Sequence, residues 1–447
     1  MNTQDSMEAL ESLWRKQGND PHNASFNLME KVVERENMNR ALKRVEKNKG
    51  AAGIDGMEVK DLRSYLKGHW PRIKEELLKG EYKPKPVKQV TIPKPDKGMR
   101  KLGIPTVLDR LIQQALLQTL NPIFDPLFCE ESFGFRPRRS AHQAVKRAQS
   151  YISQGYIYVV DIDFKDFFDR INHDVLMARI ARKVRDKRAL KLIGTYLRAG
   201  IMTRGVLVQT EEGTPQGGPL SPLLANILLD DLDKELKRRG HKFVRYADDL
   251  SIYIKSKRAG ERVMQSVKGF VRRRLKLEVN EEKSATDKPQ KRKFLGFSFW
   301  WKEKKPAIRL APKTLERFKV TVRRLTRRSW GISMKTRIEL LSTYLRGWIN
   351  YFKLIDTPSV IEYLDMWIRR RLRMCYLKQW KRAKTKRRNL IALGISEEKA
   401  RGISGSRKSY WRLSKTPQTN KALCIAFWQN LGLVSLSESY RRSHSVS

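Results

Sequence analysis

Apolar residues recur every three or four positions through much of the chain, and this spacing places them on one face of an α-helix. The ranges with this spacing are 26–47, 61–79, 106–120 and 220–239. Gly50 and Gly53 should stop the first helix, because glycine is a poor helix former. Pro122 should end the third, because proline cannot donate a backbone hydrogen bond.

Short runs rich in β-branched and aromatic residues predict strands between these helices. They are Val87–Ile92, Tyr156–Ile162, Phe243–Arg245 and Ser251–Ile254. The last two flank Tyr246-Ala-Asp-Asp249, so they predict a β-hairpin, and a turn-rich basic loop (93–98) follows the first. After Pro312 the pattern is almost wholly helical, with a polar break at 402–409. Helices and strands mixed in this way indicate an α+β protein.

Charge narrows the range of functions. The 447 residues include 94 Lys and Arg against 47 Asp and Glu, a formal net charge of +47. The excess is concentrated in residues 301–447, where 35 basic residues face 9 acidic ones. A hydrophobic content of 40% excludes wholesale disorder. So strong an excess of one charge is typical of proteins that bind a polyanion such as nucleic acid.

The cysteines, the apolar runs and the N-terminal charges exclude some classes of protein. Cys129, Cys375 and Cys424 are far apart, so the sequence contains neither a disulfide framework nor a paired-cysteine zinc site. No apolar run approaches the roughly 20 residues needed to span a bilayer. The first thirty residues carry charges throughout. We therefore expect a cytoplasmic protein without a membrane partner, associated with the nucleoid when it binds DNA.

The candidate chemistry lies in two acidic clusters. Asp248 and Asp249 are adjacent at the predicted hairpin tip, where divalent cations would relieve their repulsion; a solvated acidic turn is the alternative. Asp163 follows a buried strand, where an acidic side chain is costly unless it is paired or bound to metal. If the strand lies beside the hairpin, Asp163 and Asp248 can bracket two cations about 4 Å apart, the arrangement for in-line phosphoryl transfer. Asp161 shares a strand face with Asp163, so the spacing alone does not separate the two.

Eight strings occur in a fixed order over roughly residues 26–430, and together they resemble the reverse transcriptases encoded by group II introns, the intron maturases. The overall pattern is most similar to the compact bacterial class C enzymes, which lack an endonuclease domain. The strings are Ile92-Pro-Lys-Pro-Asp-Lys-Gly98, Leu102-Gly-Ile-Pro-Thr106, Ser132-Phe-Gly-Phe-Arg-Pro137, Asp161-Ile-Asp-Phe-Lys-Asp-Phe-Phe-Asp169, Gly213-Thr-Pro-Gln-Gly-Gly-Pro-Leu-Ser-Pro222, Arg245-Tyr-Ala-Asp-Asp249, Asn280-Glu-Glu-Lys-Ser284 and Phe294-Leu-Gly-Phe297.

The resemblance implies a catalytic and metal-binding triad of Asp163, Asp248 and Asp249, which holds two Mg²⁺ ions with Mn²⁺ as a substitute. Asp163 is favoured over Asp161 because the family's catalytic aspartate precedes an aromatic steric gate by five residues, and Phe168 stands at that distance. A gate of this kind selects deoxynucleotides by excluding the ribose 2′-hydroxyl.

Four further residues gain roles from the resemblance. Lys94 and Arg100 would clamp the triphosphate of the incoming dNTP, where cations suit the developing charge. Gln216 would lie close to the template–primer and the nucleotide, and Lys283 is a possible general acid toward pyrophosphate. Solvated basic loops and a plain glycine turn are the alternatives for these residues.

The implied fold is an α+β right-hand polymerase, with fingers and palm built on an antiparallel sheet, followed by a helical thumb and a small helical C-terminal region. We expect a polar tail over 1–24, an RNA-binding N-terminal extension over 25–60 and the reverse transcriptase fingers and palm over 61–305. The thumb, or maturase domain, is expected over 306–385 and a DNA-binding region over 386–447.

The implied function is RNA-directed DNA synthesis combined with binding of intron RNA to assist splicing and mobility. The implied partners are intron RNA, an RNA template–DNA primer duplex, target DNA and dNTPs. The alternatives are a splicing-only maturase, a host-adopted relative used in DNA repair or defence, and a non-enzymatic basic DNA-binding protein. Intact acids at positions 163, 248 and 249 argue against a decayed polymerase site.

Overall fold

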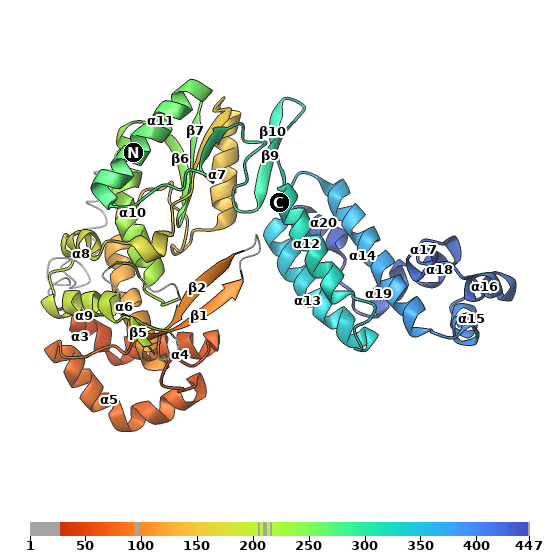
Figure 1. Ribbon diagram of the computed structural model, residues 1–447, viewed down its shortest axis with the longest axis horizontal. Coiled ribbons are helices and arrows are strands. Elements are labelled where there is room, and N and C mark those ends of the chain that lie inside the picture. Colours follow the sequence, from red (N-terminus) through yellow and green to blue (C-terminus); the bar gives the residue numbers. More distant parts are fainter. Residues whose placement is uncertain (1–26, 94–97, 204–205, 209–211, 215–216, 446–447) are drawn as a thin grey trace. The chain divides into compact units, whose positions relative to one another are not determined.

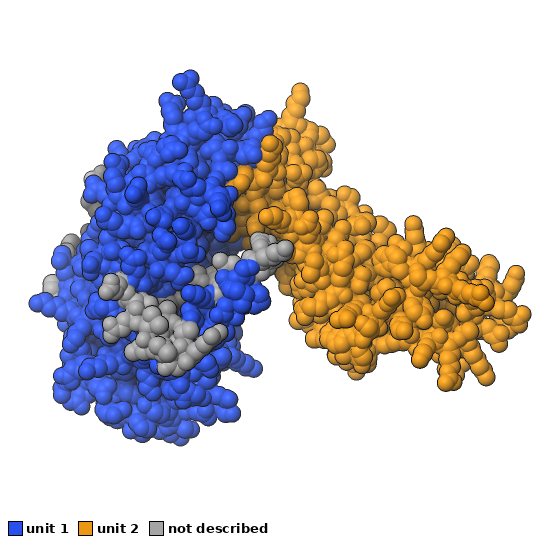
Figure 2. Space-filling view, in the orientation of Figure 1, with its two compact units in different colours: residues 1–288 blue, residues 289–447 orange. Residues whose placement is uncertain are grey.

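The computed structural model describes residues 27–445, except 94–97, 204–205, 209–211 and 215–216 (Figure 1). The chain divides into two compact units, Met1–Lys288 and Pro289–Ser447 (Figure 2). The expected five-part division remains a prediction. No helix in the described part of the chain is both long and apolar enough to cross a membrane.

The first unit begins with helices that differ in detail from those expected. The predicted helix over 26–47 is two helices, α3 (Leu28–Val33) and α4 (Arg35–Asn48), because Glu34 adopts an extended ψ of 139°. α5 spans Leu62–Lys79. α6 (Val107–Phe124) continues past Pro122, so the expected stop was wrong. Leu120 and Phe124 are buried in the core on either side of this proline, and their packing favours the last helical turn.

A small four-stranded sheet contains the two strands that precede and follow the basic loop of the sequence. It has the order β2-β1-β4-β5, formed by Met99–Ile104, Val87–Pro93, Ile201–Thr203 and Val206–Val208. β1 and β2 are an antiparallel hairpin from Lys88 opposite Ile104 to Pro93 opposite Met99. β1 also pairs with β4 in parallel, which joins two segments that are about a hundred residues apart in the chain.

The second sheet of this unit, here called the β3 sheet, has the order β6-β7-β3-β8 and is antiparallel throughout. Its strands are Lys242–Tyr246, Asp249–Ile254, Tyr158–Ile162 and Ala285–Asp287. α10 (Ser221–Arg238) and α11 (Lys257–Phe270) contribute to a hydrophobic core with Val160 and Ile252 from one face of this sheet. The opposite face carries Tyr253, whose ring lies 5.8 Å from that of Tyr151 on α7 (Ala141–Ser153).

Shorter elements complete the first unit. They are η1 (Val59–Asp61), η2 (Asp125–Leu127), η3 (Phe167–Arg170), α8 (His173–Ala181), α9 (Lys187–Arg198) and a π-helical turn, η4 (Val271–Leu275). Polar caps fix several helix starts. Ser140 accepts a hydrogen bond from the Gln143 backbone at the start of α7 in a capping box, which satisfies N–H groups that a helix otherwise leaves unpaired.

The second unit is a hairpin followed by helices. β9 (Phe297–Lys302) and β10 (Lys305–Leu310) pair antiparallel. The helices that follow are α12 (Pro312–Leu325), α13 (Met334–Phe352), α14 (Pro358–Gln379), α15 (Ala383–Ala392), α16 (Glu397–Ser404), α17 (Tyr410–Leu413), α18 (Pro417–Ala422), α19 (Ile425–Asn430) and α20 (Leu436–Ser445). The expected break at 402–409 begins only at Gly405, because Ile403 and Ser404 are buried within α16.

Candidate active site

Strand register brings the predicted carboxylates to one end of the β3 sheet. The last recorded pair between β3 and β7 is Ile162 opposite Leu250, so the next positions, Asp163 and Asp249, stand opposite each other. Tyr246 pairs with Asp249 in the β6–β7 hairpin, which leaves Ala247 and Asp248 as its two-residue turn. All three aspartates therefore lie where these strands end.

Asp163 has further contacts with the segment that contains Lys283. Its backbone N–H donates to the Ser284 hydroxyl at 3.0 Å, and its carbonyl accepts from the Asn280 N–H at 2.8 Å. The Lys283 Nζ atom lies 3.9 Å from Asp163 Oδ1, and both side chains are about half exposed. The structure thus places the expected general acid beside an expected metal-binding carboxylate.

Asp161 lies further inside the sheet, on the same face as Asp163. It pairs with Ser251 of β7 and with Ala285 of β8, so its backbone is enclosed by strands on both sides. Burial raises the pKa of Tyr253, and the negative charges of Asp161 and Asp249 raise it further. Asp161 and Asp249 therefore both lie near Tyr253, so this part of the sheet carries two carboxylates, which attract cations.

The donor chemistry fits a hard divalent cation, since carboxylate oxygens are the ligands that Mg²⁺ prefers. Asp163 and Asp248 are exposed and accessible to such an ion. Within the described ranges, however, no three His, Cys, Asp or Glu side chains gather closely enough to be a preformed metal cage. Mg²⁺ in phosphoryl transfer is commonly bound by one or two carboxylates, while substrate phosphates and water complete its coordination.

A buried arginine stabilises the turn that carries Asp248. Arg245, at the end of β6, is fully buried, and its guanidinium donates to Asp233 of α10 at 2.5–3.0 Å. The Nη1 atom of Arg245 also donates to the Ala247 carbonyl and to Asn226 Oδ1, each at 2.9 Å. Ala247 has a left-handed φ of 58°, a conformation that is costly for a non-glycine residue.

A second segment covers the same turn. Phe133 N–H donates to the Arg245 carbonyl, and Arg245 N–H donates to the Glu131 carbonyl, so 131–133 runs beside β6. Gly134 lies so close to Ala247 that a side chain there would collide with the turn's backbone. The Asn226 side chain donates to the Gly134 carbonyl at 2.9 Å, which ties this segment to α10.

Phe168, the predicted steric gate, is hydrogen-bonded to the glycine-rich segment that begins at Gly213. Phe168 is half-buried in η3, with its ring 5.1 Å from Phe167 in an edge-to-face contact. Its carbonyl accepts from the Thr214 N–H at 2.7 Å, while His173 donates from Nε2 to the Gly213 carbonyl at 2.6 Å. Gly213 has a φ of 94°, and a side chain there would collide with the Asp169 carbonyl, so this position requires glycine.

Three residues expected to contact the nucleotide are Lys94, Arg100 and Gln216. Lys94 and Gln216 lie outside the described residues. Arg100 is described through its backbone alone, which pairs with Ile92 in the β1–β2 hairpin. Their assignment to dNTP binding remains a prediction.

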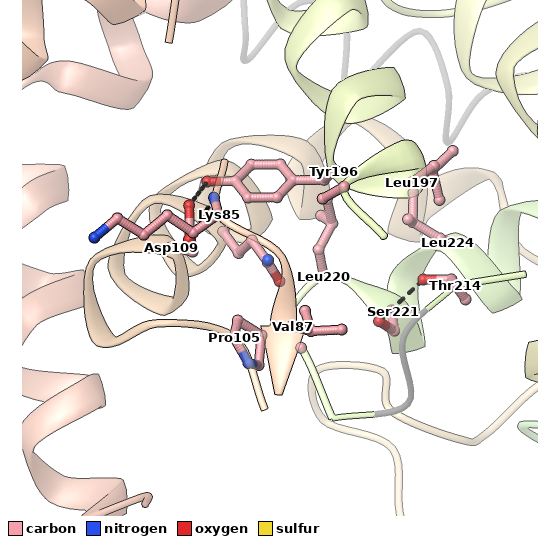
Figure 3. A pocket seen from close by; sticks show the side chains of 13 residues that line it. Lys85, Val87, Pro105, Asp109, Tyr196, Leu197, Thr214, Leu220, Ser221 and Leu224 are labelled. Carbon is pink, nitrogen blue, oxygen red and sulfur yellow. Dashed lines mark hydrogen bonds between the residues drawn. The ribbon is translucent and has the colours of Figure 1, made fainter. Parts of the chain in front are cut away.

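A buried polar network lies beside a small cavity, where Asp109 is hydrogen-bonded to Tyr196 (Figure 3). The Asp109 carboxylate accepts from the hydroxyls of Thr106 at 2.6 Å, Tyr82 at 2.9 Å and Tyr196 at 3.3 Å. Burial raises the pKa of Asp109. The adjoining cavity, lined in part by Thr214 and Ser221, has a volume of about 20 Å³, which is room for a water molecule and not for a nucleotide. The network therefore connects α6, α9 and the segment that precedes β1.

Two protein families match the chain. Residues 92–299 match "Reverse transcriptase (RNA-dependent DNA polymerase)", and residues 315–393 match "Group II intron, maturase-specific domain". The first range includes the three aspartates, Phe168 and Lys283. These matches confirm the resemblance seen in the sequence and the expected α+β right-hand polymerase fold.

The chain is also similar to individual proteins. The chain is 31% identical to Protein YkfC of Escherichia coli (strain K12), over 53% of this chain and 73% of that protein. It is 34% identical to the group II intron-encoded protein LtrA of Lactococcus lactis subsp. cremoris, over 51% of this chain but only 49% of LtrA. Among solved structures, a partial Cas6-RT-Cas1–Cas2 complex aligns at 25% identity and a TM-score of 0.36, covering 55% of this chain and 42% of that one.

The residues that frame the Asp248 turn were not predicted from the sequence. Arg245 stood in a quoted string, but its neighbours Asn226 and Asp233 lie 19 and 12 positions away on a helix. Two signals were available: a charged residue inside an apolar strand, and Asn226 and Asp233 among the buried apolar positions of α10.

Proposed function

This chain belongs to the family of group II intron-encoded reverse transcriptases that carry a maturase domain, and from this membership we propose that it copies intron RNA into DNA by two-metal nucleotidyl transfer. In the same proposal it binds that RNA to assist splicing and intron mobility. Reverse transcriptases are RNA-directed DNA polymerases that require a divalent metal, generally Mg²⁺. The observation that carries the proposal is the strand register that places Asp163 opposite Asp249, beside the Asp248 turn.

The three aspartates would hold the metal ions. When bound, two Mg²⁺ ions, or Mn²⁺ in their place, would lower the pKa of the primer 3′-hydroxyl and stabilise the charge of the leaving pyrophosphate. Asp163 would bind from the end of β3, Asp248 from the hairpin turn and Asp249 from the start of β7. Arg245 would act through the turn by fixing the Ala247 carbonyl, so it is a positioning residue and not a metal ligand.

Other side chains would orient the nucleotide and move protons. Lys283 would donate a proton from Nζ to the departing pyrophosphate, which its place beside Asp163 supports. Phe168 would fill the space of a ribose 2′-hydroxyl. Lys94 and Arg100 would neutralise the triphosphate of the incoming dNTP, and Gln216 would lie close to the template–primer and the nucleotide.

The wider partners are proposed on the same basis. Intron RNA would be bound by the N-terminal extension and the maturase helices, and target DNA by the C-terminal helices. The work would take place in the cytoplasm, and at the nucleoid when the enzyme binds DNA. A specific observation, the maturase-specific match over 315–393, also favours a role in splicing that does not require DNA synthesis.

Primer extension on an RNA template with dNTPs and Mg²⁺ tests the proposal. The wild type should give full-length DNA, and Asp248→Ala should abolish synthesis while RNA affinity is retained. Asp174→Asn is the matched control, because it removes an exposed carboxylate in the first turn of α8 that has no proposed role in the site, and it should leave synthesis intact.

Each alternative has its own outcome. Tight RNA binding by a wild type that makes no DNA would favour the splicing-only maturase. Loss of RNA binding in Asp248→Ala would contradict the proposed separation between the metal site and the RNA-binding surfaces. An active enzyme whose gene lacks flanking intron RNA domains would favour the host-adopted role in repair or defence.

A further inference from the structure

The reverse side of the β3 sheet carries a cationic surface that polymerisation does not explain. Side chains alternate between the two faces of a strand, so Val160 and Ile162 point away from the face that carries Asp161 and Asp163. α11 covers the Val160 face, because Gly260 lies directly against the side chains of Val160 and Thr286 (Figure 1). α11 therefore lies across the sheet from the aspartates, and the η4 turn continues α11.

The η4 turn presents three consecutive arginines to solvent. Val271 and Leu275 are fully buried and anchor the turn, while Arg272, Arg273 and Arg274 between them are exposed. The N–H of Lys276 donates to the Val271 carbonyl, the i to i+5 bond of a π-helix. Such turns are rare and are frequently found at functional sites. Arg272, Arg273, Arg274 and Lys276 are called the η4 cation cluster below.

Nearby acidic groups do not neutralise this cluster. Within the described part of the chain, no ion pair is recorded for any of its four members. Residues 257–276 contain eight Lys and Arg against one Glu, a net charge of +7. That glutamate, Glu261, lies 3.9 Å from Lys257 at the other end of α11.

The cluster borders an open hollow of about 710 Å³, lined by Gly269, Arg272, Arg273, Lys276, Leu277 and Glu278. Its single acidic group is already engaged, because Glu278 lies 2.8 Å from Arg170 and 3.9 Å from Lys165. No large hydrophobic side chain in 257–276 is exposed. The hollow therefore offers cations for phosphates but no aromatic platform on which single-stranded bases could stack.

We propose that the η4 cation cluster binds the phosphate backbone of a double-helical RNA segment, at a second contact separate from the template–primer at the aspartates. The inference rests on the proposed function, since it takes the opposite face of the sheet as the polymerising face. A solvated basic face is the competing interpretation. The hollow and the missing acidic partners favour a polyanionic ligand, because four exposed cations held this close together repel each other.

The test measures fluorescence anisotropy of a labelled, blunt-ended RNA hairpin, with unlabelled template–primer added to saturation so that the aspartate face is occupied. The variant combines Arg272→Gln, Arg273→Gln and Arg274→Gln, which keep long side chains and remove three charges. The matched control combines Lys237→Gln, Arg238→Gln and Lys242→Gln, which remove the same charge from exposed positions on the same unit. Unchanged melting temperatures show that both proteins are folded.

The cluster variant should weaken hairpin binding by at least about tenfold. It should also reduce the slope of log affinity against log salt by about 2–3, because each phosphate contact contributes roughly 0.9. The control should stay near the wild type, and the cluster variant should still extend a short primer. Equal losses in both variants, no loss in either, or no hairpin binding by the saturated wild type would overturn the proposal.

Primer extension separates this inference from the proposed function. Failure of the wild type to extend any primer would contradict the proposed function and leave hairpin binding measurable. Loss of short-primer extension in the cluster variant alone would assign the cluster to the polymerising face and overturn the second contact.

Discussion

Replacement of Arg245 by methionine should be among the most destabilising single changes in the first unit. The Arg245 and Asp233 side chains are both fully buried, and their closest nitrogen–oxygen distance is 2.5 Å. Arg245→Met keeps a long side chain but leaves the Asp233 carboxylate buried without its cation. It also removes the donor for the Ala247 carbonyl and for Asn226.

The size of the effect follows from the burial. Loss of one partner from a buried ion pair costs about 3–5 kcal/mol in the free energy of unfolding, because the remaining charge is uncompensated. At roughly 2–4 °C per kcal/mol for a unit of this size, the melting temperature should fall by about 10 °C. The lost hydrogen bonds belong to the same network, so their energies should not be added independently.

Thermal melting followed by circular dichroism measures this change. Adding Asp233→Leu to Arg245→Met should recover part of the loss, because a buried ion pair can often be replaced by apolar side chains. Arg238→Met is the control, since it breaks an exposed pair with Glu235 on the same helix and should leave the melting temperature unchanged. A fall of less than about 2 °C in Arg245→Met, or a double variant no better than the single, would refute the reasoning.

The remaining predictions concern the site and its support. Phe168→Ala should reduce discrimination against ribonucleotides by at least about tenfold in single-nucleotide incorporation, because the 2′-hydroxyl then has room; unchanged discrimination would remove the gate assignment. Lys283→Gln should lower the incorporation rate about a hundredfold without weakening RNA binding, because pyrophosphate loses its proton donor; an unchanged rate would mean a solvated lysine. Burial raises the folded-state pKa of Asp109 above its unfolded value, so the stability from this group is present below the unfolded pKa and is lost as pH rises through the folded pKa. Asp109→Asn should therefore show a smaller loss of melting temperature than the wild type as pH rises from the acid range towards neutrality, and parallel curves would contradict this.

Local patterns predicted most elements because they depend on local sterics and burial. The strand expected over 156–162 is β3 at Tyr158–Ile162, and the helix expected over 220–239 is α10 at Ser221–Arg238. The predictions failed where tertiary packing outweighed a local preference. Pro122 stays inside α6 because Leu120 and Phe124 are buried beside it, and Glu34 divides a pattern that was continuous in hydrophobicity.

The sequence by itself determined which chemical groups this protein carries and their order in the motifs, because these depend only on the residues along the chain. It indicated carboxylates at the end of one strand and at a hairpin tip, an aromatic residue five positions after Asp163, and an excess of cations. Only the tertiary structure decided the register that sets Asp163 opposite Asp249 and the contact between Arg245 and Asp233. Register and buried pairing depend on how distant segments share one core, and no local pattern encodes that packing.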